Sequence, residues 1–207
     1  MFTIFRLVFG SIVFVTCFIL IRKSRTLHKR RWLITAFVAV IILTTISALI
    51  PIENAFVTFS SQESAYHYNN SGDVKLVVNG EESDFIVGSN GDTEVYTIVP
   101  KSNDGWKLGM GLDTKRVVQI ISDGISVCVY RYKNSDDYYI TVFDTNGGPF
   151  EITDNRSTKF QCLDESNSAL NKTFYTYYAY INDYDNQYVL TVNGKTIKTQ
   201  EAVSSFS

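Results

Sequence analysis

The sequence predicts a mainly β protein in which two N-terminal transmembrane helices precede one antiparallel β-rich domain, sandwich- or barrel-like, with a single short helix. Three observations predict this fold class. Two apolar stretches open the chain, a short basic segment separates them, and from Asp73 onward apolar residues recur at every second position between turn residues. We therefore expect a transmembrane helical hairpin over residues 1–52 and an extracytoplasmic domain over residues 53–207.

The two predicted spans cover residues 2–21, with Arg6 as the only charge, and residues 32–52, with no charge. A helix of about 20 residues crosses a hydrocarbon core of about 30 Å. The loop between them, residues 22–31, has six basic side chains and no acid: Arg22, Lys23, Arg25, Lys29, Arg30 and Arg31. Because short basic loops stay on the cytoplasmic side, these residues determine the topology. They predict a multi-pass protein of the cell membrane with an extracellular C-terminal domain.

Two other interpretations compete for the first stretch. A cleaved signal peptide also places a basic residue before an apolar region. This region is longer than a usual signal core, however, and basic residues follow it in place of a small-residue cleavage site. A lipoprotein anchor at Cys17 is disfavoured because Phe14, Val15 and Thr16 are bulkier than the residues that precede such a site.

Charge is divided unevenly along the chain. Of the 19 basic residues twelve follow residue 52, whereas all 21 acidic residues do, so the predicted domain carries 12 minus 21, or −9. A surface this acidic disfavours nucleic acid as a partner. Cys128 and Cys162 are the two cysteines of this domain, and their spacing leaves open whether they form a disulfide.

Local patterns predict the elements of the domain. Ser60, with Glu63 three residues later, predicts a capping box that starts one short helix through Tyr68. Asn79-Gly80 and Asn193-Gly194 predict two-residue hairpin turns, because both central positions of such a turn need positive φ. About eight to ten strands are expected. The clearest alternating runs are Val74/Leu76/Val78, Ile125/Val127/Val129, Tyr138/Ile140/Val142 and Tyr188/Leu190/Val192.

No residue pattern predicts a catalytic site, a cofactor or a metal site. His67 is the only histidine of the predicted domain, and the chain has no Gly-x-Ser-x-Gly, Cys-x-x-Cys or His-Glu-x-x-His motif. Asp183 and Asp185 alternate as ligands do in a calcium loop, but the glycine and the closing glutamate of such a loop are lacking. This segment is therefore interpreted as a solvated turn.

Tyrosines gather near the end of the chain and provide the candidate binding residues. Amphipathic rings of this kind often build binding surfaces. The candidates are Tyr175, Tyr177, Tyr178, Tyr180 and Tyr184. A central strand that is buried on both faces also takes aromatic residues at consecutive positions, so a core role stays open for the same rings.

Three stretches carry a resemblance to known proteins. They are IPIENAFVTFSSQESA at residues 50–65, VPKSNDGWKL at residues 99–108, and VNG at residues 192–194. With them the chain resembles a group of small membrane proteins of low-GC Gram-positive bacteria, in which two spans precede a single extracytoplasmic domain. The resemblance implies a bacterial cell membrane and few structural disulfides. It carries over no catalytic or ligand residues.

The function expected from the sequence is a membrane-anchored extracytoplasmic module that binds a protein, a peptide or an envelope component. One alternative is a surface hydrolase that acts on envelope glycans through acid pairs such as Glu81-Glu82 or Asp136-Asp137. Another is a small accessory subunit of a membrane complex. For that role the small residues of the spans would pack against other helices: Ser11, Thr16, Thr44, Thr45, Ser47 and Ala48.

Overall fold

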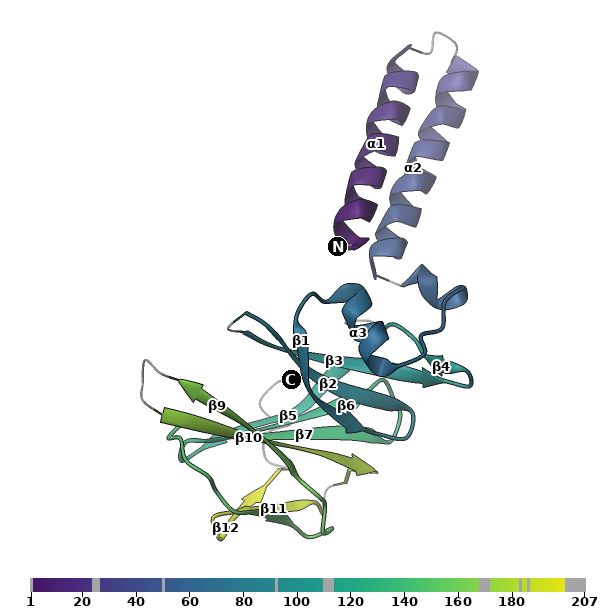
Figure 1. Ribbon diagram of the computed structural model, residues 1–207. Helices are drawn as coiled ribbons and strands as arrows, with labels where there is room; N and C mark the ends of the chain where they lie inside the picture. The colour runs from purple at the N-terminus through teal and green to yellow at the C-terminus, as the bar shows by residue number, and fades with distance from the viewer. Residues whose placement is uncertain are drawn as a thin grey trace.

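The protein is described by a computed structural model, which covers residues 2–23, 27–49, 51–91, 93–109, 114–167, 172–182, 184–185 and 187–199. Two long helices, α1 (Phe2–Lys23) and α2 (Leu27–Leu49), lie side by side as an antiparallel hairpin. The hairpin stands apart from a β-rich region, which we define as the described residues from Ile52 onward (Figure 1). Strands in antiparallel sheets dominate that region, which confirms the mainly β prediction.

The connection between the two helices is shorter than the sequence predicts. Most of the predicted loop is helical, because α1 continues through Lys23 and α2 already begins at Leu27. Arg25 lies outside the described residues. The other five topology-determining cations lie in the last turn of α1 or the first turns of α2: Arg22, Lys23, Lys29, Arg30 and Arg31. All five are at the end of the hairpin that points away from the β-rich region (Figure 1).

The two helices pack through apolar side chains. The rings of Phe14 and Phe37 lie 4.7 Å apart between α1 and α2. The described side chains of α1 begin at Gly10. Among the helical residues described, no stretch is both long enough and apolar enough to cross a membrane.

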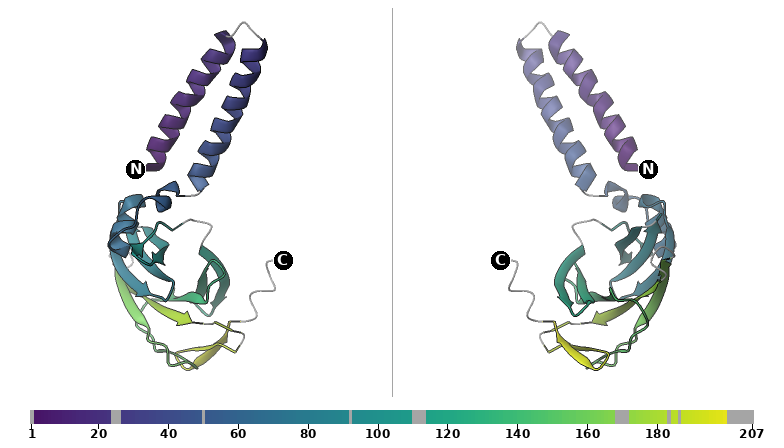
Figure 2. Two further views of the ribbon diagram at one scale, coloured as in Figure 1. Left: turned by 90° about the vertical axis from the view of Figure 1, so that its right-hand side faces the viewer. Right: turned by 90° about the vertical axis from the view of Figure 1, so that its left-hand side faces the viewer.

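The β-rich region contains three sheets, and every strand pair in them is antiparallel. Sheet 1 has the order β1 (Asp73–Asn79), β2 (Ser83–Asn90), β3 (Thr93–Ser102) and β4 (Gly105–Trp106). Sheet 2 has the order β5 (Thr114–Ser122), β6 (Ile125–Tyr132), β7 (Asp137–Asp144), β10 (Lys172–Asn182) and β9 (Gln161–Asn167). Sheet 3 has the order β12 (Lys195–Lys198), β11 (Val189–Val192) and β8 (Ile152–Asp154). The sheets curve into an open half-barrel (Figure 2).

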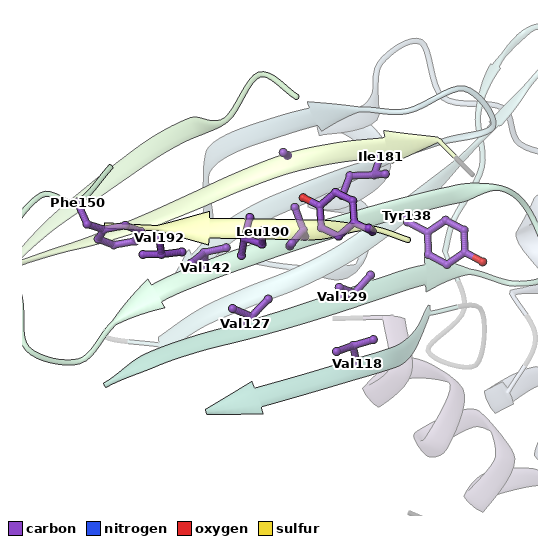
Figure 3. Packing of buried hydrophobic residues seen from close by; sticks show 12 residues of the cluster. Val118, Val127, Val129, Tyr138, Val142, Phe150, Ile181, Leu190 and Val192 are labelled. Atoms are coloured by element: carbon purple, nitrogen blue, oxygen red, sulfur yellow. The ribbon is translucent and has the colours of Figure 1, made fainter. Parts of the chain in front are cut away.

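Sheet 2 is the middle layer and is buried on both faces. Tyr139 of β7 points into a core with Phe85 of sheet 1. Its neighbours Ile140 and Val142 point the other way, into a core with Leu190 of sheet 3 (Figure 3). Since a strand alternates its side chains between two faces, burial of both faces explains why β7 carries apolar or aromatic residues from Tyr138 to Phe143, with Thr141 as the one exception.

The outer face of sheet 1 is covered by α3 (Gln62–Asn69), a short α-helix. Ala65 and Tyr66 of α3 are buried against Ile86 and Val99 of sheet 1. Along one direction the layers are therefore α3, sheet 1, sheet 2 and sheet 3, with sheet 3 farthest from the helical hairpin (Figures 1 and 2).

The start of α3 is one residue later than predicted. The N-cap is Ser61, not Ser60, and its hydroxyl accepts a hydrogen bond from the Ser64 amide at 3.1 Å. The Ser61 amide in turn donates to the Ser64 hydroxyl at 3.2 Å. Serine at the third helical position thus completes the capping box in place of Glu63, whose side chain is exposed.

One of the two predicted Asn-Gly turns is confirmed and the other is wrong. Asn193 and Gly194 have φ of 50° and 73° and connect β11 to β12 directly. Between β1 and β2, however, the turn is centred on Glu81 and Glu82, and the Gly80 amide donates to the Ser83 carbonyl at 2.9 Å. Gly80 is required for close approach instead: a Cβ there would lie 2.3 Å from the Tyr139 hydroxyl.

Candidate functional site

The five candidate tyrosines do not share one surface. Tyr178 and Tyr180 of β10 point toward sheet 1, and Tyr178 has no exposed surface. Tyr175 and Tyr177 of the same strand point toward sheet 3, where Tyr184 also packs. Because β10 is an inner strand of the middle sheet, its consecutive rings enter two different cores. A binding role for the partly exposed rings stays a prediction.

Contacts of these rings are those of packed core residues. Tyr178 lies 6.5 Å from Phe85 between the centres of the rings, and burial raises the pKa of its phenol. On the other face the rings of Tyr177 and Phe150 lie 4.5 Å apart. Tyr184 donates to the hydroxyl of the buried Thr199. Each of these contacts stabilises the fold by joining segments distant in sequence.

The structure brings the acid pairs Glu81-Glu82 and Asp136-Asp137 close together. The contact is between the backbone amides of the first pair and the Asp137 carboxylate, and not between their carboxylates. Asp137 is 2% exposed, and its carboxylate accepts hydrogen bonds from the amides of Glu81 and Glu82 at 3.1 and 2.9 Å. It also accepts from the Ser83 hydroxyl at 2.7 Å and the Tyr180 hydroxyl at 2.9 Å. All four usual acceptor positions of the carboxylate are therefore filled.

This arrangement is a joint between sheets 1 and 2. The side chains of Glu81 and Glu82 are exposed, whereas Asp137 and Ser83 are closed to solvent. A glycan hydrolase needs two carboxyl groups that face a substrate from opposite sides. The buried, saturated Asp137 does not offer such a group, and the Ser83 hydroxyl is likewise out of reach as a nucleophile.

The cysteines are free, and the two in the β-rich region lie far apart. Cys128 is on β6 and Cys162 is on β9, and β7 and β10 lie between these strands. Three strand spacings of about 4.8 Å separate them by roughly 14 Å, about twice the longest Cα distance of a disulfide. In the part of the chain that the structure describes, no group of three or more His, Cys, Asp or Glu side chains is placed to hold a metal ion.

The predicted turn at Asp183 to Gln187 is described only in part, since Asp183 and Asn186 lie outside the described residues. The carboxylate of Asp185 accepts a hydrogen bond from the Gln187 amide at 2.8 Å. It also pairs with the Arg156 guanidinium at 3.0 Å. These two bonds are those of a structured turn.

An open groove lies where sheets 2 and 3 approach each other at one end of the β-rich region. Its volume is about 350 Å³, and it lies between the β5–β6 and β11–β12 hairpins. Four apolar residues form its partly or fully buried floor: Ile120, Ile125, Val192 and Ile197. Exposed Asp123, Lys195 and Lys198 are among its polar residues. We call it the edge groove.

The edge groove is bordered by two strand edges. Among the described strands β5 pairs with β6 alone, and β12 pairs with β11 alone. Each outer edge therefore presents backbone amides and carbonyls that no neighbouring strand in the described residues occupies. Such an edge is a template for pairing with an additional extended segment.

Charge at the edge groove differs from the charge of the region as a whole. Lys195 forms an ion pair with Asp123 across the groove, and the hydrogen bond from the Lys195 ammonium lowers the pKa of the Asp123 carboxyl. Lys198 has no carboxylate partner among the described residues. Two cations and one acid give the groove a charge of +1. The sequence after residue 52 carries −9.

Sequence reasoning identified one of the two turns that shape the edge groove and missed the other. Asn193-Gly194 is the predicted turn. Asp123-Gly124 connects β5 to β6 with φ of 50° and 83°, the same positive-φ pair. Asp-Gly between apolar runs is a signal for such a turn and could have located it. The groove itself depends on residues more than 60 positions apart, which no local pattern reveals.

Comparisons of this chain with protein-family models, with curated protein sequences and with solved structures found no match.

Proposed function

We propose that this protein is a membrane-anchored binding module of a bacterial cell. In this proposal the helical hairpin lies in the cell membrane, the β-rich region lies at the outer face, and the edge groove binds an extended segment of a partner protein. The observation that carries the anchoring part is the exposure of apolar side chains around both helices. The exposed set comprises Ile12, Phe14, Val15, Phe18, Ile19, Leu20, Ile34, Val38, Ile41 and Ile42.

A helix that is apolar all round requires apolar surroundings. A helix on the surface of a soluble protein buries one stripe and presents a polar face to water. Ile12, Val15 and Ile19 are each more than half exposed, and so is Ile42 on the second helix. Burial of apolar surface is favourable by about 25 cal/mol per Å², so a bilayer would stabilise this hairpin strongly relative to water.

Hydroxyl groups on the helices support the same proposal. Thr16 donates to the Ile12 carbonyl at 2.8 Å, and Thr45 donates to the Ile41 carbonyl at 2.9 Å. A hydroxyl in a hydrocarbon core must find its partner within the protein, and the carbonyl four residues earlier is the usual one.

The sidedness follows from the cations at the turn of the hairpin. They gather at the end away from the β-rich region, whereas the described helical residues from Trp32 to Leu49 carry no charge (Figure 1). Short basic connections stay in the cytoplasm, so the β-rich region belongs outside it.

Protease treatment of intact protoplasts tests the anchoring and the sidedness together. We expect added protease to remove most of the β-rich region while the hairpin stays with the membrane. The control is a cytoplasmic protein, which must survive the same treatment. A chain that resists protease until the membrane is lysed contradicts the proposed sidedness, and a chain recovered in the soluble fraction contradicts the anchoring.

The edge groove favours an acidic, partly apolar extended segment as its occupant. Two strand edges offer backbone hydrogen bonds, the floor accepts apolar side chains, and Lys198 offers a cation to a carboxylate. Lysine on a strand edge also hinders aggregation between sheets.

Site-specific photo-crosslinking on intact cells tests the groove. A crosslinking residue in place of Thr196, at the groove, should yield an adduct with another protein. The matched control replaces Glu63, which is exposed on α3. The adduct from position 196 should disappear when Ile197→Asp places a charge in the groove floor. Adducts that are absent, equal at both positions or insensitive to Ile197→Asp contradict binding in the groove.

A second candidate function, that of an accessory subunit, is favoured by one observation in the hairpin. A groove of about 520 Å³ runs between α1 and α2, and small residues Gly10, Ser11 and Thr45 line it beside Phe14 and Val40. Small residues let a further helix approach closely within a membrane. Crosslinks to a membrane protein from position 41, with none from position 196, would favour this function over the first.

A further inference from the structure

The segment between α2 and α3 holds an apolar side chain in full contact with solvent. Phe56 is 89% exposed, more than any other large apolar residue described, and the adjacent Val57 is 37% exposed. The segment begins with the short helix η1 (Ile52–Ala55). Two adjacent exposed apolar side chains on a hydrogen-bonded backbone are available for contact with another apolar surface.

This segment is fixed to sheet 1 by three sets of hydrogen bonds. The Asn54 amide group donates to the Leu108 carbonyl at 2.9 Å, and the Leu108 amide donates back to Asn54 Oδ1 at 2.7 Å. Phe59 and Trp106 exchange backbone hydrogen bonds of 2.9 and 3.0 Å. These bonds lie on both sides of Phe56 in the sequence.

The third set holds the residues immediately after Phe56. The Lys107 ammonium donates to the Val57 carbonyl at 2.8 Å and to the Thr58 hydroxyl at 2.7 Å. The Phe56 and Val57 amides both donate to the Glu53 carbonyl, at 2.9 and 2.7 Å. The exposure of Phe56 therefore does not come from a loose chain. The backbone holds this ring in place on the surface.

Phe56 also lies close to the membrane if the hairpin is inserted. It is seven positions after Leu49, the last residue of α2, which limits the distance to roughly 25 Å even for an extended chain. Figure 1 places this segment between the end of α2 and sheet 1. Aromatic side chains gather at the boundary of a bilayer: Trp and Tyr do so in membrane-spanning proteins, and Phe does so on the apolar face of helices that lie in the interface.

We infer that Phe56, with Val57, inserts into the outer interfacial layer of the bilayer and so fixes the orientation of the β-rich region. The inference rests on the proposed membrane anchoring. The hydrogen bonds to Leu108, Trp106 and Lys107 transmit the position of the segment to sheet 1. Sheet 3 lies at the opposite end of the region from the hairpin, so this contact would present the edge groove away from the membrane (Figures 1 and 2).

Tryptophan fluorescence in lipid vesicles tests the insertion. The full chain with Trp32→Phe is reconstituted into phosphatidylglycerol and phosphatidylcholine vesicles with or without bromine on the acyl chains, which quenches nearby tryptophan. Phe56→Trp adds a tryptophan in the segment. Ile121→Trp is the matched control, because Ile121 is 70% exposed on β5 beside the edge groove. The emission of Trp106, measured in the parent chain, is subtracted.

We expect bromine to reduce the added emission of Phe56→Trp by a factor on the order of two and to leave that of Ile121→Trp unchanged. Val57→Trp should show a smaller loss and serves as a second probe if Phe56→Trp misfolds. If Phe56→Trp and Val57→Trp each emit equally with and without bromine, in a chain that floats with the vesicles, this inference is overturned and the anchoring stands. A chain that does not float with the vesicles overturns both.

Discussion

At the joint between sheets 1 and 2, four hydrogen-bond donors point at the carboxylate of Asp137. These bonds explain the position of the turn between β1 and β2. Asp137 accepts from the Glu81 and Glu82 amides and from the Ser83 and Tyr180 hydroxyls. The turn between β1 and β2 is therefore centred on Glu81 and Glu82. Asp137, a candidate catalytic acid by its sequence, thus serves to join two layers.

Asp137→Ala should destabilise the protein by on the order of 3 kcal/mol, since it leaves several buried donors without an acceptor. Asp137→Asn should also destabilise, because its NH₂ group would face donors. The measurement is guanidinium denaturation followed by the fluorescence of Trp106, which lies in sheet 1 and donates to Asp84 at 2.6 Å. The control is Asp136→Ala, an exposed neighbour. Equal midpoints for Asp137→Ala and Asp136→Ala would show that the joint contributes little.

At the scale of elements, side chains at the end of β8 hold sheet 3 together. Asn155 donates to the Gln187 carbonyl at 2.8 Å and accepts from the Val189 amide at 3.1 Å. Asp154 accepts from the Tyr188 hydroxyl at 3.0 Å and from the Thr158 amide at 2.8 Å. These bonds join β8 to the start of β11, and so they support the hairpin that borders the edge groove.

Low pH should weaken the contact between β8 and the start of β11, because Asp154 is then protonated. Burial raises the pKa of its carboxyl, but hydrogen bonds from Thr158, Tyr188 and the Arg156 amide outweigh burial and lower the pKa overall. A lowered folded-state pKa gives stability that is present above the ordinary aspartate pKa of about 3.9 and is lost as the pH falls through the folded value.

Asp154→Asn should therefore lower the denaturation midpoint at neutral pH and have a smaller effect in acid, once the pH has fallen below the lowered folded-state pKa and the wild-type carboxyl is itself protonated. Guanidinium titrations of both chains at the two pH values measure this difference. An effect of Asp154→Asn that is the same at both pH values would mean that ionisation of this carboxyl does not contribute.

For the whole molecule, the sequence predicted the mainly β class of the fold and located four alternating runs that lie in β1, β6, β7 and, apart from Tyr188, β11, because these features depend on local alternation. Val74/Leu76/Val78 and Asn193-Gly194 lie in the predicted elements. The sequence did not predict features that depend on contacts between distant residues. Gly80, for example, is needed for the close approach of Tyr139 rather than for a positive φ. Tyr177 and Tyr178 enter opposite cores only because β10 is an inner strand of a sheet covered on both faces. The edge groove, which joins hairpins far apart in the sequence, has no local signal at all.

Buried tyrosines link the three layers to the behaviour of the molecule in alkali. Burial is the largest cause of a raised phenol pKa in nine of the 13 tyrosines, and it raises that of Tyr130 to about 12. The nine are Tyr66, Tyr96, Tyr130, Tyr139, Tyr177, Tyr178, Tyr180, Tyr184 and Tyr188. Apart from Tyr96, which is 38% exposed, they lie in or against the cores on both sides of sheet 2 and under α3, so their ionisation tests the packing of these cores.

A raised folded-state pKa leaves stability intact below the ordinary tyrosine pKa of about 10 and reduces it as the pH rises beyond that value, because the unfolded chain releases protons that the folded chain retains. Above about pH 10 we expect tyrosinate absorbance to rise together with the loss of near-ultraviolet circular dichroism, in one cooperative step. The same chain in guanidinium should titrate gradually around pH 10. If most of the tyrosinate absorbance instead develops while the folded dichroism persists, the rings are open to solvent and the layered packing is contradicted.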